Sequence, residues 1–143
     1  MIENKQYGLI EGKKENKPWI GIVNLNLFKF NEKSNFPWFV SINIDIPMPD
    51  NNGLPTNNEA KILDKFEDKL IKLIEYKKNN TFYLGRISWN GKRNLFLQVS
   101  NPKETDLLLK ELIKRKKYPR EFEYLIKEDS EWLNAFEIFK LSH

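Results

Sequence analysis

Residues 83–100, YLGRISWNGKRNLFLQVS, predict two strands joined by a tight turn. Asn90 and Gly91 stand at the centre of the stretch, and both residue types tolerate the positive φ that a two-residue hairpin loop needs. In the second half, apolar residues alternate with polar ones, which is the period of a strand with one buried face. The stretch therefore predicts a β-hairpin over residues 81–99.

Helical spacing flanks this hairpin on both sides. Before it, residues 56–78 place Thr56 and Glu59 at the spacing of a capping box. After it, a second helix begins with Asn101 as its N-cap and Pro102 as its first residue. The expected buried stripes are Ile62, Leu63, Phe66, Leu70, Leu73 and Ile74 in the first helix, and Leu108, Leu109, Leu112 and Ile113 in the second.

Two further strands enclose this unit. Residues 37–47 alternate so that four apolar side chains share one face, and residues 120–128 form the last expected strand. The order β-α-β-β-α-β over residues 37–128 predicts an α+β fold with a ferredoxin-like core, in which both helices cover one face of an antiparallel sheet. The four side chains expected on the buried face of the first strand are Val40, Ile42, Ile44 and Ile46.

Each end of the chain adds a smaller unit. Residues 1–36 predict an N-terminal hairpin extension, with strands over 5–12 and 17–28, that either lengthens the sheet or covers its open face. Residues 129–143 predict a short C-terminal helix and tail, with Asp129 as its cap. The 143 residues show no compositional break, so we expect a single domain over 1–143. The aromatic side chains expected to pack this last helix on the fold are Trp132, Phe136 and Phe139.

Composition indicates where in the cell the protein is located. The chain has no cysteine and a formal net charge of +4. No apolar run approaches the roughly 18 residues of a membrane helix, and the first residues lack the pattern of a signal peptide. We therefore expect a cytoplasmic protein that does not associate with a membrane.

Several short motifs occur in a defined order: GLPT at 53–56, Glu59 and Glu67 in the first helix, YLGR at 83–86, NGKR at 90–93, and a final Asp129 and Trp132. Together they resemble the domain-of-unknown-function 695 family of bacterial proteins, over about residues 17–140. Small ferredoxin-like proteins of this kind are also loosely similar to the B-type regulators of ribonuclease E, which act by binding a protein. The resemblance implies a binding role and supplies no catalytic residues.

Catalytic signals are scarce in the sequence. The only histidine is His143, the last residue, and no cysteine, Gly-rich phosphate loop or nucleophile elbow is present. The carboxylates of Asp64, Glu67 and Asp68 lie close on the first helix, where neighbouring lysines favour a solvated face. We therefore expect a protein that is not an enzyme and uses neither a metal nor a cofactor. The alternative is a carboxylate-dependent hydrolase, which requires acidic residues that face one another in a cleft.

The hairpin tip supplies the main candidate for a binding surface. Trp89 lies beside the turn with Arg86 and Arg93 near it, and Trp and Arg dominate binding hot spots. The alternative is a tip closed by cross-strand packing. The first interpretation predicts a protein partner, either a toxin that the chain blocks as an immunity protein or an enzyme that it regulates, by steric masking. The sheet also allows a homodimer.

A second interpretation is RNA binding by the open face of the sheet. RNA recognition motifs share the β-α-β-β-α-β order and stack bases on aromatic side chains of their central strands. Phe39 and Phe96 are expected on that face, with Lys92 at the start of the third core strand. The basic run at 114–120 is either a phosphate-binding patch or a complement to the negative end of a helix dipole.

Overall fold

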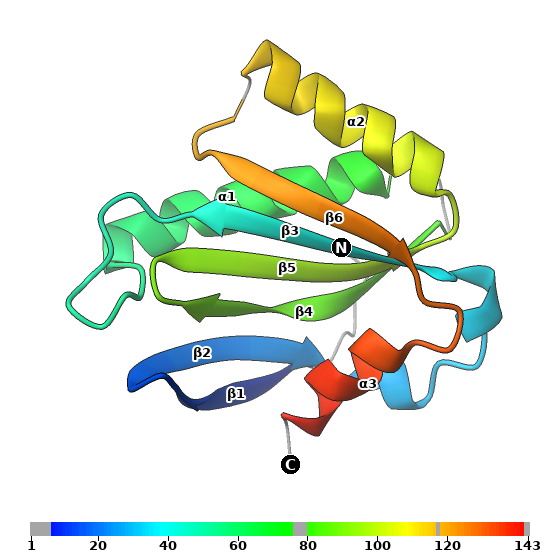
Figure 1. Cartoon of the computed structure of the whole chain (residues 1–143), viewed down its shortest axis with the longest axis horizontal. Helices are drawn as coiled ribbons and strands as arrows, with labels where there is room; N and C mark the ends of the chain where they lie inside the picture. The colour runs from blue at the N-terminus through cyan, green and yellow to red at the C-terminus, as the bar shows by residue number, and fades with distance from the viewer. Residues whose placement is uncertain (1–6, 76–79, 117, 142–143) are drawn as a thin grey trace.

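A computed structural model describes residues 7–75, 80–116 and 118–141. In this part of the chain one six-stranded antiparallel sheet carries α1 and α2 on one face and α3 on the other (Figure 1). The strands are β1 (Tyr7–Lys14), β2 (Lys17–Asn24), β3 (Trp38–Asp45), β4 (Thr81–Trp89), β5 (Lys92–Val99) and β6 (Phe122–Glu128). The helices are α1 (Asn57–Ile74), α2 (Pro102–Arg115) and α3 (Leu133–Lys140), with 3₁₀ turns at Leu25–Phe28 and Lys33–Asn35.

The strand order confirms the ferredoxin-like core. The sheet runs β1-β2-β4-β5-β3-β6, and every neighbouring pair is antiparallel. The last four of these strands, with α1 and α2, are the β-α-β-β-α-β unit expected from the sequence. The N-terminal hairpin lengthens this sheet, because β2 pairs with β4 from Trp19↔Trp89 to Val23↔Gly85. Of the two expectations for the hairpin, the structure therefore shows extension.

Local sequence signals define the turn of the central hairpin and the N-terminal ends of α1 and α2. Asn90 and Gly91 have φ of 49° and 79°, the positive values expected for the hairpin turn. The Asn101 side chain accepts hydrogen bonds from the backbone amides of Lys103 and Glu104, as expected for an N-cap. Only half of the predicted capping box forms in α1, because Thr56 Oγ1 accepts from the Glu59 amide at 3.3 Å while the Glu59 carboxylate binds elsewhere.

The first hydrophobic core lies between the sheet and the helices α1 and α2. Val40, Ile42 and Ile44 of β3 are buried in it, as predicted, and so is Ile46 just after the strand. The stripe of α1 differs slightly from the expectation, because Ile71 is buried while Ile62 is 37% exposed and Leu73 is only half-buried. Residues 76–78, which the sequence assigned to this helix, lie outside the described residues.

A second core lies on the opposite face of the sheet, under α3 and residues 25–36. The expected strand over 17–28 ends at Asn24, because this buried side chain accepts from the Asn26 amide and donates to the Tyr83 carbonyl. Trp132 and Phe139 are buried here, whereas Phe136 is 54% exposed, contrary to expectation. Phe136 projects from α3 beside the face that Ala135, Ile138 and Phe139 bury.

The Asp129 side chain caps the start of α3, as the sequence indicated, but Trp132, which was expected within the helix, occupies the N-cap position before Leu133. The Asp129 carboxylate accepts hydrogen bonds from the backbone amides of Leu133 and Asn134, at 2.9 and 3.0 Å. Trp132 precedes the helix with a φ of 58°. None of the helices in the described part of the chain has the length and apolarity needed to cross a membrane.

Gly85 produces an irregularity in β4 that matters for the site. The register shifts between Tyr83 and Gly85, and Gly85 has a φ of 152°. A Cβ atom at this position would lie 2.3 Å from the Ile22 carbonyl oxygen of β2. The bulge changes the alternation of β4, so that Tyr83 and Arg86 face the same side of the sheet.

Replacing Gly85 with alanine is expected to lower the free energy of unfolding by about 1–3 kcal/mol, because the residue must hold a strained φ and displace β2. Thermal or urea unfolding of the variant measures this loss. Gly91→Ala is the matched control, because a Cβ at that turn position meets only a side-chain atom of Pro49 at 3.9 Å. If Gly85→Ala and Gly91→Ala lower the free energy of unfolding equally, the positive φ, and not the contact with β2, causes the destabilisation.

Candidate functional site

The structure separates the three residues predicted to form one binding surface. Arg86 and Arg93 lie on the face of the sheet that α1 covers, and Arg93 is 4% exposed. Trp89 lies on the opposite face, where it lines a hollow. The predicted surface of Arg86, Trp89 and Arg93 is therefore corrected. Side chains of a strand alternate between faces, and Arg86 pairs with Leu95, so it shares the face of Leu95 and Arg93 and not that of Trp89.

Both arginines belong to a buried charge cluster under α1. Glu67, which is 4% exposed, accepts hydrogen bonds from Tyr83 Oη at 3.0 Å and from Arg86 Nη1 at 3.0 and 3.1 Å. Arg93 Nη1 lies 3.3 Å from Glu67 Oε1 and 2.8 Å from Asp64 Oδ1. The expectation of a solvated carboxylate face is therefore wrong for Glu67, since its partners come from strands β4 and β5 across the core.

Electrostatics in this cluster favour the neutral phenols of Tyr7 and Tyr83 and the charged guanidinium of Arg86. Burial raises the pKa of Tyr83 well above its ordinary value, and the neighbouring Glu67 charge raises it further. Burial and the charges of Glu67 and Glu75 raise the pKa of Tyr7 to about 12. Burial alone would lower the pKa of Arg86, but the Glu67 carboxylate raises it above the ordinary value. Through Glu67, the cluster ties α1 to strands β4 and β5 of the sheet.

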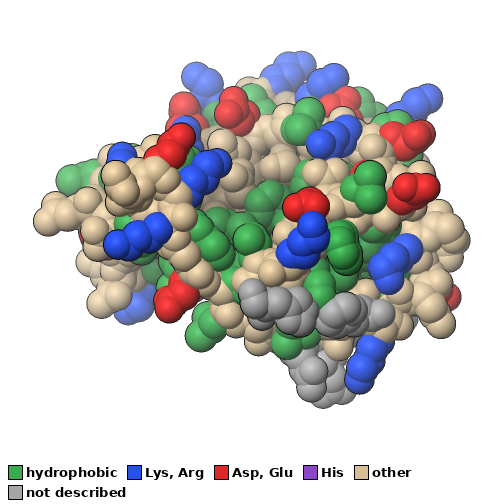
Figure 2. All heavy atoms as spheres, turned by 60° about the horizontal axis from the view of Figure 1, so that its bottom comes forward, with side chains coloured by type: hydrophobic (Ala, Val, Ile, Leu, Met, Phe, Trp, Pro, Cys, Tyr) green, Lys and Arg blue, Asp and Glu red, His purple; other side chains and the backbone are tan. Residues whose placement is uncertain are grey.

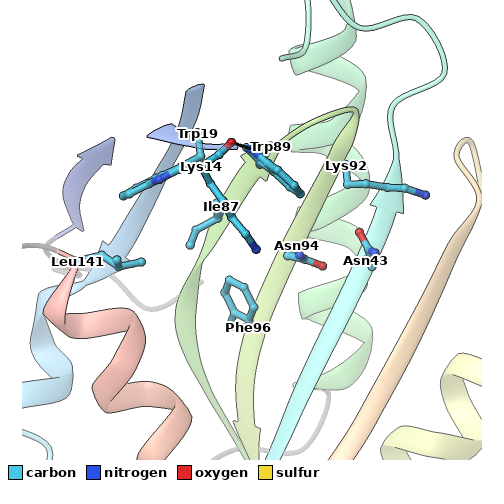
Figure 3. Close-up of a pocket in the computed structure, with 9 residues that line it drawn as sticks. All are labelled: Lys14, Trp19, Asn43, Ile87, Trp89, Lys92, Asn94, Phe96 and Leu141. Atoms are coloured by element: carbon cyan, nitrogen blue, oxygen red, sulfur yellow. Dashed lines mark hydrogen bonds between the residues drawn. The ribbon is translucent and has the colours of Figure 1, made fainter. Parts of the chain in front are cut away.

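The open part of the other face holds a hollow of about 360 Å³. Its apolar wall consists of Trp19, Ile87, Trp89, Phe96 and Leu141, and its polar side chains are Lys14, Asn43, Lys92 and Asn94 (Figure 3). In Figure 2, hydrophobic side chains gather in the middle of the face that the view presents, with charged side chains around them. This volume lies within the range of ligand-binding pockets, at its lower end.

Rigid strands position the aromatic wall of this hollow. Trp19 and Trp89 face each other in the β2–β4 register. The Trp19 ring lies over Gly12, where a Cβ atom would come within 2.5 Å of it. The Trp89 indole N–H donates to the Lys14 carbonyl at 3.1 Å, and Lys14 Nζ lies 4.9 Å from the centroid of the Trp89 ring. The two tryptophans are therefore held in place while parts of both rings stay exposed.

The residues of the RNA interpretation differ in accessibility. Phe39 and Phe96 stack with ring centroids 6.0 Å apart, but Phe39 is buried in the second core while Phe96 lines the hollow. Lys92 forms an ion pair with Asp45 across the β3–β5 ladder. A base can therefore reach Phe96 but not the face of Phe39, because the second core covers it.

The basic run at 114–120 is partly neutralised. Arg115 pairs with Glu111 at 2.5 Å, and Arg120 binds the Glu59 carboxylate through two nitrogens at 2.6 and 2.7 Å. Those hydrogen bonds lower the pKa of Glu59. Lys117 and His143 lie outside the described residues. In residues 7–75, 80–116 and 118–141, no three His, Asp or Glu side chains are grouped so as to hold a metal ion.

Sequence reasoning missed Trp19, Lys14 and Leu141 as lining residues of the hollow, because strands and a helix far apart in the chain bring them together. It also missed the burial of Arg93, although a signal was present. Arg93 is two positions before Leu95 and four before Leu97 in β5, so all three side chains face the same side of the sheet, and the leucines show that this side is buried.

Fold and site together define a ferredoxin-like α+β domain with a lengthened sheet, one face closed by two helices and the other only partly closed by a third. The model of a family of unknown function, DUF695, matches residues 9–138, and the chain belongs to this family. No match is found among curated proteins, nor among solved structures. The looser likeness to the regulators of ribonuclease E is not shown by these comparisons.

Proposed function

We propose that this chain is a non-enzymatic, cytoplasmic protein-binding module whose contact surface is the hollow around Trp19, Trp89 and Phe96. The observation behind this proposal is a set of partly exposed aromatic side chains on rigid strands, beside a sheet face that α3 covers only in part. Aromatic anchors in a preformed hollow are what protein interfaces use as hot spots. The partner is a toxin or a regulated enzyme that the chain masks sterically.

The charged residues of the domain support a binding role over catalysis. Glu67 and Glu59, the two carboxylates on the helix side of the fold that are most buried, are each held by arginine. A carboxylate fixed in this way is a poor general acid or base, because its oxygens already accept hydrogen bonds from arginine and it does not line the hollow. The hollow itself is lined by aromatic, amide and lysine side chains.

Trp89→Ala is expected to weaken capture of the partner by about 30-fold or more, as for a central hot-spot residue. The measurement is a pull-down from nuclease-treated lysate of the source cells, followed by titration of the captured protein against each variant. Leu107→Ala is the matched control, because Leu107 is an exposed apolar residue on α2. Phe96→Ala provides a second variant from the hollow. Undiminished capture by both Trp89→Ala and Phe96→Ala would exclude the hollow as the contact surface.

RNA binding is the second candidate function, and one observation favours it. Lys14 and Lys92 border the exposed rings of Trp89 and Phe96, which is the combination that single-stranded nucleic acid uses. This alternative predicts that nuclease removes whatever the chain captures, and that binding falls steeply as salt rises.

A further inference from the structure

The hollow continues across the sheet as a groove. A second depression of about 280 Å³, next to β6, shares Asn43 and Asn94 with it. The register places Ile87, Asn94, Asn43 and Glu123 in one row across strands β4, β5, β3 and β6. Strands lie about 4.8 Å apart, so this row is about 14 Å long, which is the length of about four extended residues.

Both sides of this row are defined by the register. On one side lie Trp19 and Trp89, and on the other lie Phe96, Ser41 and Leu125. Figure 3 shows Asn43 and Asn94 side by side at the floor, with Lys14 extending into the hollow. The groove is therefore apolar at its β2–β4 end and amide-lined in the middle.

The side-chain amides of Asn43 and Asn94, in the middle of the groove, can form hydrogen bonds with a peptide group. Asn43 Oδ1 is buried and accepts no hydrogen bond among the described residues. A buried acceptor without a partner is unfavourable, and rotation of the Asn43 carboxamide toward the groove would let this oxygen accept from an N–H donor of an occupant. A carboxamide offers one acceptor and two donors, which complement the N–H and C=O of a main-chain amide in either orientation of the side chain.

The charges along the groove have opposite signs at its two ends. Lys14 lies at the aromatic end, and the exposed Glu123 lies at the β6 end. A polynucleotide carries a negative charge at every phosphate and would meet Glu123 unfavourably. A peptide can instead place an acidic residue at one end and a basic residue at the other.

We propose that the groove binds an extended segment of the partner protein. A large apolar side chain of the segment occupies the hollow, and the next peptide group binds Asn43 and Asn94. An acidic residue beside the apolar one faces Lys14, and a basic residue two positions further along faces Glu123. This proposal rests on the proposed function and names the part of the partner that is recognised.

Four capped peptides of one composition test the proposal on the full chain. Acetyl-Glu-Trp-Ala-Lys-amide and acetyl-Lys-Ala-Trp-Glu-amide place the acid next to the tryptophan in both chain directions. Acetyl-Lys-Trp-Ala-Glu-amide and acetyl-Glu-Ala-Trp-Lys-amide exchange the two charges without changing net charge. Binding is followed by the ¹H–¹⁵N signals of the Trp19 and Trp89 indoles and of the Asn43 and Asn94 amides, with the buried Trp132 indole as an internal control.

At least one acid-adjacent peptide is expected to bind about threefold or more tighter than both charge-exchanged peptides, as for an exposed ion pair. Lys14→Ala removes this preference. Asn43→Ala weakens the preferred peptide by about tenfold, as for two lost hydrogen bonds. Equal binding of all four peptides, or binding of an oligouridylate in preference to them, would overturn the proposal.

The same variants separate this proposal from the function on which it rests. If Trp89→Ala loses the captured partner while Lys14→Ala and Asn43→Ala both retain it at full affinity, the groove proposal fails and the protein-binding function stands. If Trp89→Ala and Phe96→Ala both retain the partner, the groove proposal and the proposed binding function of the hollow fail together. If all four variants weaken capture, the peptide groove and the binding function are supported jointly.

Discussion

Glu67→Ala is expected to lower the free energy of unfolding by about 3–5 kcal/mol, because it leaves buried cations without their counter-ion. Among the described residues, Arg93, which is 4% exposed, and Arg86 keep Asp64 as their ion-pair partner after the change, and Asp64 is itself 54% exposed. Arg86 and the Tyr83 hydroxyl lose their hydrogen bonds to the same carboxylate. Chemical denaturation followed by far-ultraviolet circular dichroism measures the loss.

Two further substitutions make the test of Glu67 specific. Asp64→Ala removes a carboxylate from the same helix and the same cluster, but Asp64 is 54% exposed, so its loss should stay within about 1 kcal/mol. Glu67→Gln keeps the shape and one acceptor, and should fall between wild type and alanine. Denaturation midpoints that coincide for Glu67→Ala and Asp64→Ala would show that the buried pairing does not stabilise α1 on the sheet.

Trp132→Ala should destabilise the fold by about 3–5 kcal/mol, because it empties the centre of the second core. The ring stacks on Phe30 with centroids 5.5 Å apart and lies 5.3 Å from the ring of Phe82. Its indole N–H also donates to the Phe36 carbonyl at 2.9 Å. Guanidinium denaturation, again followed by circular dichroism so that tryptophan emission plays no part, provides the measurement.

The aromatic residues near Trp132 supply its controls. Trp132→Phe keeps most of the packing and removes the hydrogen bond, so a loss of about 1–2 kcal/mol is expected. Phe136→Ala, at an exposed position on α3, should change stability by about 0.5 kcal/mol or less. Should Trp132→Ala prove as stable as Phe136→Ala, the second core would not be what holds α3 against the sheet.

The sequence by itself determined the features that depend on neighbours along the chain. The turn at Asn90 and Gly91, the cap at Asn101 and the alternation in β3 all follow from residues within a few positions of each other. The order of these elements then determined the ferredoxin-like core, because few topologies accommodate β-α-β-β-α-β. The alternation along β5 also indicates that Arg93 is buried, because it places Arg93 on the same face as Leu95 and Leu97, although a basic residue suggests a surface position.

Only the tertiary structure decided the arrangement of the site. The bulge at Gly85 puts Tyr83 on the same side of the sheet as Arg86, so that both bind Glu67, and a Cβ at Gly85 would collide with β2. Trp19 meets Trp89 because strands about 70 residues apart along the chain pair in one register. Leu141, just after the end of α3 at Lys140, lines the hollow together with residues of strands β1 to β5, so the hollow follows from contacts between distant segments that no local pattern encodes.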